Sequence, residues 1–243
     1  MNHAPAVSDT PWDFRNRALV FGLIYGIGFF VGFNLQANIY HDLTPSYALL
    51  GARWGDAGVH AAAWLAALVA LAGWLIRVWG SSYLSSGIVW SDAVRTGVLR
   101  VSGPYRYVRN PLYLGNLLLA LGIGMLGPPS AATIIIVGNI IFVYRLIAIE
   151  ERSLLQAHGQ AYEAYRKSVP RLLPRLTPAA LPATDQRPSW SDGLRGELFM
   201  AGFAFAMLYN AAFSWTAPNW LVMSPLFFSG FAVQLVVRPR PQA

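Results

Sequence analysis

The segment that decides the fold consists of two apolar runs around a short break: LYLGNLLLALGIGML at 112–126, GPPS at 127–130 and AATIIIVGNIIFVYRLIAI at 131–149. Proline cannot continue a helix, and glycine permits a turn. The break therefore predicts a tight helical hairpin. Because the two helices of a hairpin run antiparallel, we expect the residues before 112 and those after 149 to meet at one end of the pair.

The rest of the chain has the composition of a membrane protein. Of its 243 residues, 55% are hydrophobic and 12% are charged, whereas a soluble domain has about 25% charged residues. A membrane-spanning helix needs about 20 mostly apolar residues. Six stretches approach this requirement: Ala18–Tyr40, Val59–Trp79, Leu112–Leu126, Ala131–Ile149, Leu194–Phe213 and Trp220–Val237. The sequence thus predicts an all-α, polytopic integral membrane protein with about six transmembrane helices.

The arginines predict how the chain is oriented. All basic residues except Lys167 are arginine. With six crossings and a cytoplasmic N-terminus, only Arg53 would lie outside, in agreement with the positive-inside rule. Most of these arginines need only set the orientation, but a basic inner face also favours anionic lipids or an anionic cofactor. The richness in Ala and Arg favours a bacterial inner membrane, with both termini cytoplasmic.

Composition also argues against several classes of site. The chain has no cysteine, so it has no thiolate metal site and no cysteine nucleophile. His41, His60 and His158 are scattered along the sequence, and we expect no metal site. With one lysine and few charges overall, the chain is not expected to bind nucleic acid.

The same patterns divide the chain into five parts. We expect a cytoplasmic tail at 1–17, two transmembrane helices at 18–94, and a cofactor-binding core with the hairpin at 95–175. A Pro-rich linker follows at 176–193, and two C-terminal helices at 194–243. In the first helix, Gly22 and Gly26, and Gly28 and Gly32, have the spacing that allows close helix packing.

Two polar segments flank the hairpin. Asn110 and Pro111 fit the N-cap and first position of the third helix, and a helix N-terminus binds a carboxylate or phosphate well. Arg106 and Arg109 lie beside it in the sequence. At the other end of the hairpin, Glu150 and Glu151 are expected to close the fourth helix, where the helix dipole disfavours negative charge.

Carboxylates near the bilayer usually mark a function or pair with a cation. Arg145, Arg152 and Arg195 are the alternative ion-pair partners for Glu150 and Glu151. Adjacent residues on a helix point about 100° apart, so the two carboxylates are expected to make different contacts.

Together these residues predict one polar site for a small molecule on the inner face. The helix N-terminus would hold an anionic group, and the carboxylates would accept hydrogen bonds from hydroxyl or amino groups. Five tyrosines are available for stacking: Tyr105, Tyr107, Tyr113, Tyr162 and Tyr165. A zwitterionic cofactor that carries a nucleoside would suit such a site.

The same residues resemble a known family. The pattern is Gly103-Pro104-Tyr105-x-x-x-Arg109-Asn110-Pro111-x-Tyr113-x-Gly115, Glu150-Glu151-x-x-Leu154, Gly159-x-x-Tyr162-x-x-Tyr165, Pro170 and Pro174. It is similar to the isoprenylcysteine carboxyl methyltransferases, which belong with the membrane phospholipid methyltransferases. The resemblance covers residues 95–175, and its two linked motifs make it more specific than a lone short motif.

The resemblance implies an S-adenosylmethionine-dependent methyltransferase. Carried over by position, it implies these cofactor contacts: Gly97, Val98, Leu99, Arg100, Tyr105, Asn110, Pro111, Leu112, Tyr113, Glu150 and Glu151. It also suggests Glu150, Arg145 and Tyr113 as the catalytic residues. The methyl acceptor would enter from the lipid and meet the cofactor at the inner face. Its methylated group would be a carboxylate, a thiol or an amine.

Three features depart from the family pattern. Asn110 stands where the family typically has a histidine, and asparagine does not titrate near neutral pH. The family often has an arginine four residues before the first glutamate, where this chain has Leu146; Arg145 is one residue away, rotated by about 100°. Two further helices follow the motifs, whereas the better-known members mostly end before them.

Two other functions stay open at this stage. One is an NADPH-dependent membrane reductase of the steroid-reductase type, because Asn110-Pro111-x-Tyr113 is also similar to the motif of that family. The Glu150-Glu151 pair argues against this alternative. The other is a non-catalytic membrane protein that keeps the fold. In either case, membrane lipids are expected partners.

Overall fold

A computed structural model describes residues 11–40, 42–84, 99–181, 187–216 and 218–237. These ranges contain helices and no strand, which confirms the all-α fold. The helices are α1 (Trp12–Arg15), α2 (Arg17–Leu35) continued by the π-helical η2 (Gln36–Tyr40), α3 (Ser46–Gly51), η3 (Ala52–Trp54), α4 (Gly55–Ser82), η4 (Gly103–Arg106), α6 (Pro111–Gly124), α7 (Pro129–Ser168), α8 (Trp190–Gly196), α9 (Leu198–Phe213) and α10 (Trp220–Val237).

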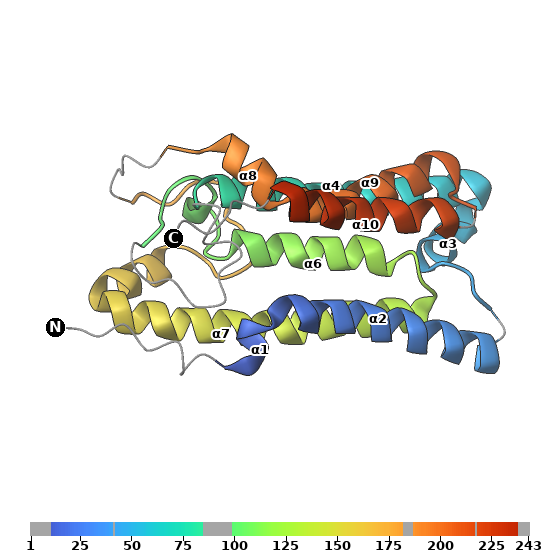
Figure 1. Ribbon diagram of the computed structural model, residues 1–243, viewed down its shortest axis with the longest axis horizontal. Helices are drawn as coiled ribbons and strands as arrows, with labels where there is room; N and C mark the ends of the chain where they lie inside the picture. The colour runs from blue at the N-terminus through green and yellow to red at the C-terminus, as the bar shows by residue number, and fades with distance from the viewer. Residues whose placement is uncertain (1–10, 41, 85–98, 182–186, 217, 238–243) are drawn as a thin grey trace.

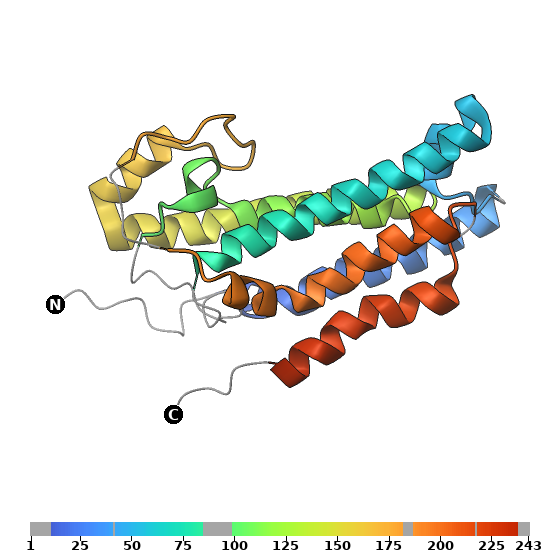
Figure 2. The ribbon, with the colours of Figure 1, turned by 90° about the horizontal axis from the view of Figure 1, so that it is seen from above.

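The long helices lie side by side along the longest axis of the molecule (Figures 1 and 2). The central helix α6 packs against α4 on one side and α7 on the other, while α2 packs on α7. Helix α4 also contacts α9, which pairs with α10. The bundle is therefore organised around the two helices of the hairpin.

Three helical segments are long and apolar enough to cross a membrane: Arg17–Ile39, Ser46–Ser82 and Pro129–Ser168. Helices α8 and α9, which meet at a bend of 72°, make a fourth if the pair counts as one span. Helix α6 is apolar but has only 14 residues, about 21 Å at 1.5 Å per residue. The membrane architecture is confirmed, whereas the number of six crossings stays a prediction.

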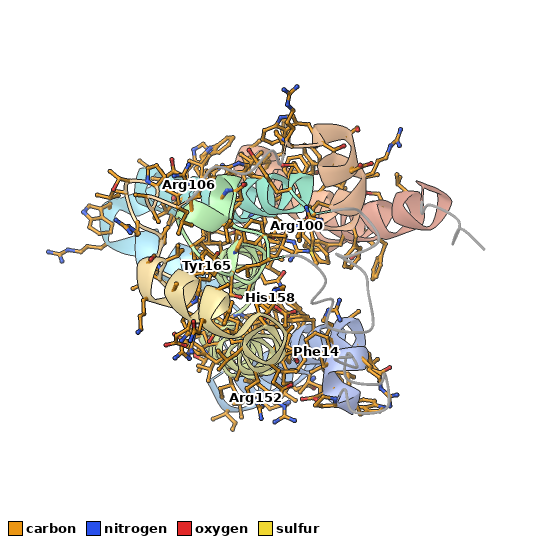
Figure 3. All side chains as sticks on the ribbon, turned by 90° about the vertical axis from the view of Figure 1, so that its left-hand side faces the viewer. Phe14, Arg100, Arg106, Arg152, His158 and Tyr165 are labelled. Carbon is orange, nitrogen blue, oxygen red and sulfur yellow. The ribbon has the colours of Figure 1, made fainter. Side chains whose placement is uncertain are left out.

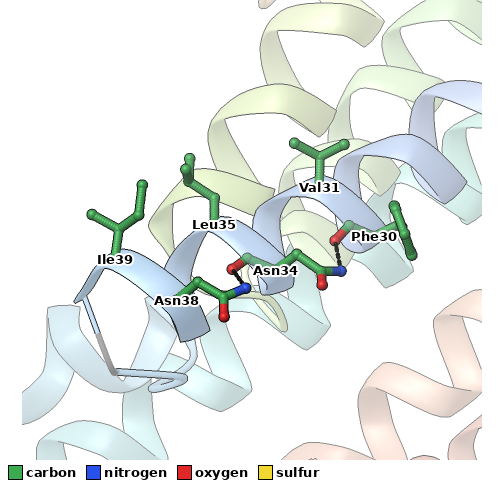
Figure 4. Close-up of a pocket in the computed structure, with 6 residues that line it drawn as sticks. All are labelled: Phe30, Val31, Asn34, Leu35, Asn38 and Ile39. Carbon is green, nitrogen blue, oxygen red and sulfur yellow. Dashed lines mark hydrogen bonds between the residues drawn. The ribbon is translucent and has the colours of Figure 1, made fainter.

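The outer surface of the bundle carries large apolar side chains. Phe30 is 72% exposed and Ile141 is 66% exposed, as expected where helices face lipid rather than water. An open apolar groove of about 340 Å³ lies on this surface, along the second half of α2 (Figure 4). Within it, Asn34 and Asn38 donate to backbone carbonyls of the same helix, so their amides need no external partner.

The hairpin between α6 and α7 is as tight as the break at 127–130 predicts. The backbone N–H of Ser46 donates to the carbonyl of Gly127 over 2.8 Å, and the Ser130 hydroxyl donates to the carbonyl of Gly32. In the first helix, Gly28 and Gly32 meet α7 closely, whereas a Cβ atom added at Gly22 or Gly26 would have no described residue of another element within 4 Å. Close packing is thus confirmed for the second glycine pair only.

The prediction that Glu150 and Glu151 close the fourth helix is wrong. Helix α7 continues to Ser168, interrupted only at Gly159, whose φ of 51° and ψ of −123° break the helical path. The residues at 152–158 contain no proline or glycine and favour helix, so the helix extends beyond the apolar run. Both carboxylates therefore lie within the helix, away from the negative end of its dipole.

The fifth predicted helix, Leu194–Phe213, is also not continuous. The chain enters α8 at Trp190 and bends at Glu197 before α9 begins. Glycine is a poor helix former, and Gly193 and Gly196 precede the bend. Glu197 forms a buried ion pair with α4, and this contact favours the bend at that residue.

Candidate active site

The hairpin brings Tyr113 and Glu150 together at one end of the bundle. The Tyr113 hydroxyl, from the first turn of α6, donates to Oε1 of Glu150 on α7 over 2.8 Å. Tyr113 is buried and Glu150 is partly exposed. Because a carboxylate can accept about four hydrogen bonds, Glu150 retains capacity for a ligand after the contact with Tyr113.

Glu151 lies on the same turn but has entirely different contacts. Its carboxylate forms ion pairs with Arg109 at 2.9 Å and with Arg171 at 2.6 Å. The carboxylate raises the pKa of the Arg171 guanidinium through its hydrogen bond. The two adjacent glutamates therefore make different contacts, as their separation of about 100° predicts.

Both arginines beside the start of α6 bind the protein itself. Arg109 also donates to the carbonyl of Val169 over 2.8 Å, and Arg106 donates to the carbonyl of Ala179 over 2.8 Å. The backbone N–H of Arg175 donates to the carbonyl of Tyr107. These contacts fasten the segment at 169–181 over the loop that precedes α6, so the beginning of the predicted linker packs firmly at this end.

Asn110 and Pro111 occupy the N-cap and first position of α6, as predicted. The Asn110 side chain makes no capping hydrogen bond. Instead, its Nδ2 donates to the carbonyl of Arg171 over 3.1 Å. The N-terminus of α6 therefore keeps the positive end of its dipole, which favours an anionic group.

Tyr105, in η4 before the start of α6, contacts the last part of α7. Its backbone carbonyl accepts a hydrogen bond from the Tyr165 hydroxyl over 2.8 Å, and burial raises the pKa of the Tyr105 phenol well above its usual range. Leu99 packs against the buried cluster that contains Tyr162 and Tyr165. Arg100 is close enough to Tyr105 to interact with it electrostatically.

Figure 3 views the bundle from this end. In this view the labelled Tyr165 and His158, both on α7, lie on the side of that helix nearer to the labelled Arg100 and Arg106. The Nε2 atom of His158 is buried and has no hydrogen-bond partner in the part of the chain that the structure describes. Among the described residues, no three histidine or acidic side chains gather to hold a metal ion.

Arg145, suggested as a catalytic residue, forms an ion pair with Asp13 of α1. Its side chain is 60% exposed, and it lies five residues before Glu150, on another face of α7. Its catalytic role stays a prediction. Two of the predicted cofactor contacts, Gly97 and Val98, lie outside the described residues.

Several residues at this end carry no signal in the local motifs. Phe14 is only 1% exposed and packs in a cluster with Tyr113 and Leu146. Arg17 lies over the Phe14 ring, 5.0 Å from its centroid, and interacts electrostatically with Glu150. An apolar residue within a polar tail could have indicated that Phe14 is buried. Its partners Tyr113 and Leu146 could not be predicted, because they lie about 100 residues or more further along the chain.

The segment that forms this end matches a known family. Residues 61–161 match the model of the phospholipid methyltransferase family. This range contains most of α4, all of α6, and α7 as far as Ala161. The resemblance to membrane methyltransferases is therefore confirmed for this part of the chain.

Three curated relatives are similar to parts of the chain. A methanethiol S-methyltransferase of Crocosphaera subtropica is 38% identical over 29% of this chain and 27% of the relative. A protein-S-isoprenylcysteine O-methyltransferase of Schizosaccharomyces pombe is 36% identical over 37% of this chain and 39% of the relative. The cobalt-zinc-cadmium resistance protein CzcN of Cupriavidus metallidurans is 32% identical over 42% of this chain and 44% of the relative.

The chain thus spans less than half the length of each of these relatives. No solved structure matches it.

Proposed function

We propose that this protein is an integral membrane methyltransferase that uses S-adenosylmethionine and methylates a lipophilic or small acceptor at the cytoplasmic face. The observation that carries the proposal is the contact between Tyr113 and Glu150. It joins the two polar motifs at one end of the bundle, inside the segment that matches the phospholipid methyltransferase family.

The residues at this end fit the chemistry of S-adenosylmethionine. Its carboxylate suits the N-terminus of α6, where the Asn110 side chain makes no capping hydrogen bond. Its hydroxyl or amino groups suit Glu150, which retains acceptor capacity. The apolar and aromatic groups around Leu99, together with Tyr105, whose carbonyl accepts from Tyr165 of the same cluster, suit its base. Glu151 contributes indirectly, because its ion pairs hold the surrounding loops together.

S-adenosylmethionine, when bound, supplies an electrophilic methyl group on a positively charged sulfur. Transfer of such a group depends largely on positioning and on removing water from the nucleophile. The Tyr113 hydroxyl orients the Glu150 carboxylate, and the segment at 169–181 covers the loop before α6. A carboxylate or thiolate acceptor needs no base, whereas Glu150 can accept the proton of an amine acceptor.

The names of the relatives bear on the acceptor. One specifies the sulfur of methanethiol and another an oxygen of S-isoprenylcysteine. We therefore propose an acceptor that reaches the site from the lipid and carries a thiol or a carboxylate, with amines as the third class. The apolar outer surface of the bundle supports entry from the membrane.

Calorimetric titration of the detergent-purified protein tests the proposal. We expect saturable micromolar binding of S-adenosylmethionine and S-adenosylhomocysteine, and no binding of NADPH. Release of S-adenosylhomocysteine is then measured with a short-chain thiol and with a prenylated cysteine. With either acceptor, S-adenosylhomocysteine should be released faster than from the protein with S-adenosylmethionine and no acceptor.

Two results would contradict the proposed cofactor, and a third would contradict the proposed acceptors. Binding of NADPH alone would indicate a reductase. A folded protein that binds none of the three ligands would indicate a non-catalytic membrane protein. Cofactor binding without turnover on either acceptor would reject the two acceptors tested, and an amine acceptor would be examined next.

A further inference from the structure

A second pair of charged side chains is buried inside the bundle, apart from Glu150 and Glu151. The Arg77 side chain on α4 is 7% exposed and the Glu197 side chain is completely buried. Nε of Arg77 donates to Oε2 of Glu197 over 2.6 Å, and Nη2 donates to Oε1 over 3.1 Å. This two-pronged geometry is the strong form of an arginine–carboxylate contact.

The remaining nitrogen of the Arg77 guanidinium reaches α6. Its Nη1 donates to the carbonyl of Leu112 over 3.2 Å and to Oδ1 of Asn116 over 2.7 Å. Leu112 directly precedes Tyr113, which holds Glu150. One side chain therefore connects Glu197 to the first turn of the helix that carries the proposed cofactor contacts.

A glycine of the family-like motif makes this path possible. A Cβ atom at Gly115 would collide with Cγ of Arg77 and with the carbonyl oxygen of Gly73. The absence of a side chain at Gly115 lets the arginine stem cross the surface of α6. The motif glycine thus has a specific structural role, which is to admit Arg77.

Glu197 is also held by its own neighbours. It lies at the bend between α8 and α9, where its carboxylate accepts a hydrogen bond from the Ser81 hydroxyl. Its backbone carbonyl accepts one from Nε1 of Trp74 over 3.1 Å. The contacts fix the beginning of α9 against α4, although α8, α9 and α10 lie outside the segment at 61–161 that matches the family.

We propose that Arg77 and Glu197 are positioning residues of the active site, through which α8 and α9 hold the first turn of α6 in place. This inference rests on the proposed function for its link to the cofactor. The C-terminal helices then form part of the working enzyme and fix the helix that carries Tyr113.

Energetics favour positioning over simple stabilisation. A buried ion pair repays the cost of removing its charges from water only when geometry is good, and apolar replacements are often equally stable. Intramembrane charges that persist usually serve a function. Here Arg77 donates to the Leu112 carbonyl and to Oδ1 of Asn116, both on α6. An apolar replacement of Arg77 would remove both hydrogen bonds.

The test replaces both charges with apolar side chains in the full-length protein. In the double variant R77M/E197L we expect a thermal midpoint close to that of the wild type. Amide exchange in residues 112–118 should become about tenfold faster, and the Kd for S-adenosylhomocysteine should rise about tenfold. The matched control R166M/E163L removes an exposed ion pair of α7 and should change neither quantity.

Two results would overturn the inference. Faster exchange in 190–204 with unchanged exchange in 112–118 would show that the pair only anchors α8 and α9. Unchanged Kd together with unchanged exchange in 112–118 would show that it does not position α6. If R77M/E197L fails to fold, N116L decides, because it keeps the ion pair but removes the Asn116 acceptor: faster exchange in 112–118 supports positioning, and unchanged exchange rejects it.

Failure of the proposed function gives a different pattern. A wild-type protein that binds neither S-adenosylmethionine nor S-adenosylhomocysteine would reject the cofactor. The exchange measurement on 112–118 needs no ligand and would still report whether Arg77 and Glu197 position α6.

Discussion

The surroundings of Glu150 and Glu151 differ sharply, although the two residues are adjacent on α7. Glu151 is enclosed by two arginines, one from the loop before α6 and one from the segment after α7. Glu150 meets the neutral Tyr113 hydroxyl and is partly exposed. One carboxylate is used to join three segments of the chain, and the other keeps capacity for a ligand.

This difference shows that a shared motif does not imply a shared role. A carboxylate between two guanidinium groups is already satisfied, and a ligand would have to compete with both cations. A carboxylate that accepts one hydrogen bond from a phenol can still bind hydroxyl or amino groups. We therefore propose that Glu151 stabilises the fold and that Glu150 binds the cofactor, and the substitutions below test this division.

Glu151→Gln should have the largest effect, and the effect should fall on stability. The change leaves Arg109 and Arg171 without their counter-charge, and breaking such a largely buried pair costs about 3 kcal/mol. The thermal midpoint in detergent should fall by several degrees. An unchanged midpoint would mean that the contacts of Arg109 with backbone carbonyls are sufficient to hold the loops.

Glu150→Gln should affect binding instead. Loss of a hydrogen bond to a charged group should raise the Kd for S-adenosylmethionine roughly tenfold to a hundredfold, while the thermal midpoint stays near that of the wild type. Calorimetric titration measures the Kd. Glu163→Gln, on an exposed part of the same helix, is the control. Wild-type affinity in folded Glu150→Gln would remove Glu150 from the site.

Asn110→His should be tolerated, with a change in Kd of less than about threefold. Asn110 donates to the carbonyl of Arg171, and a histidine N–H can also donate to a carbonyl, so the loop contact can be kept. The substitution restores the residue typical of the family. Complete loss of cofactor binding, measured by the same titration, would show that the asparagine has a role of its own.

Asp13→Asn should have the smallest effect. The hydrogen bond from Arg145 lowers the pKa of Asp13 from its usual 3.8, so the ion pair stabilises the fold above this pH and is lost as the pH falls through the lowered value. Because Arg145 is exposed, the variant should unfold only slightly earlier than the wild type at pH 7, and this difference should be smaller at pH 3, below the usual pKa of an aspartate. A constant difference at both pH values would exclude the charge as the cause.

Much of this architecture could be predicted from local sequence. The Gly127-Pro128-Pro129-Ser130 break indicated the hairpin because its constraints act within a few residues. The hairpin in turn indicated that Asn110 and Glu150 lie at one end of the bundle. The extension of α7 beyond Ile149 was missed because hydropathy marks the end of an apolar run, whereas helix formation in 152–158 depends on backbone propensity.

The partners of individual charges could not be predicted from spacing. Arg145, Arg152 and Arg195 were the candidates for the glutamates, yet Arg109 and Arg171 contact Glu151. Glu197 lies within the predicted helix Leu194–Phe213 and Arg77 within the predicted helix Val59–Trp79, and neither local pattern indicates a partner. Their contact joins residues 120 positions apart, a separation at which sequence periodicity carries no information.

The sequence by itself determined the elements of this protein: the apolar helices, the sharp turn between two of them and the end of the bundle at which polar motifs gather. These depend on short-range backbone constraints and on the hydrophobic effect, which acts on each segment separately. Only the tertiary structure decided which charges meet. That choice depends on the packing of helices from distant parts of the chain, since glycines such as Gly115 set how closely two helices approach and thereby which side chains can reach one another.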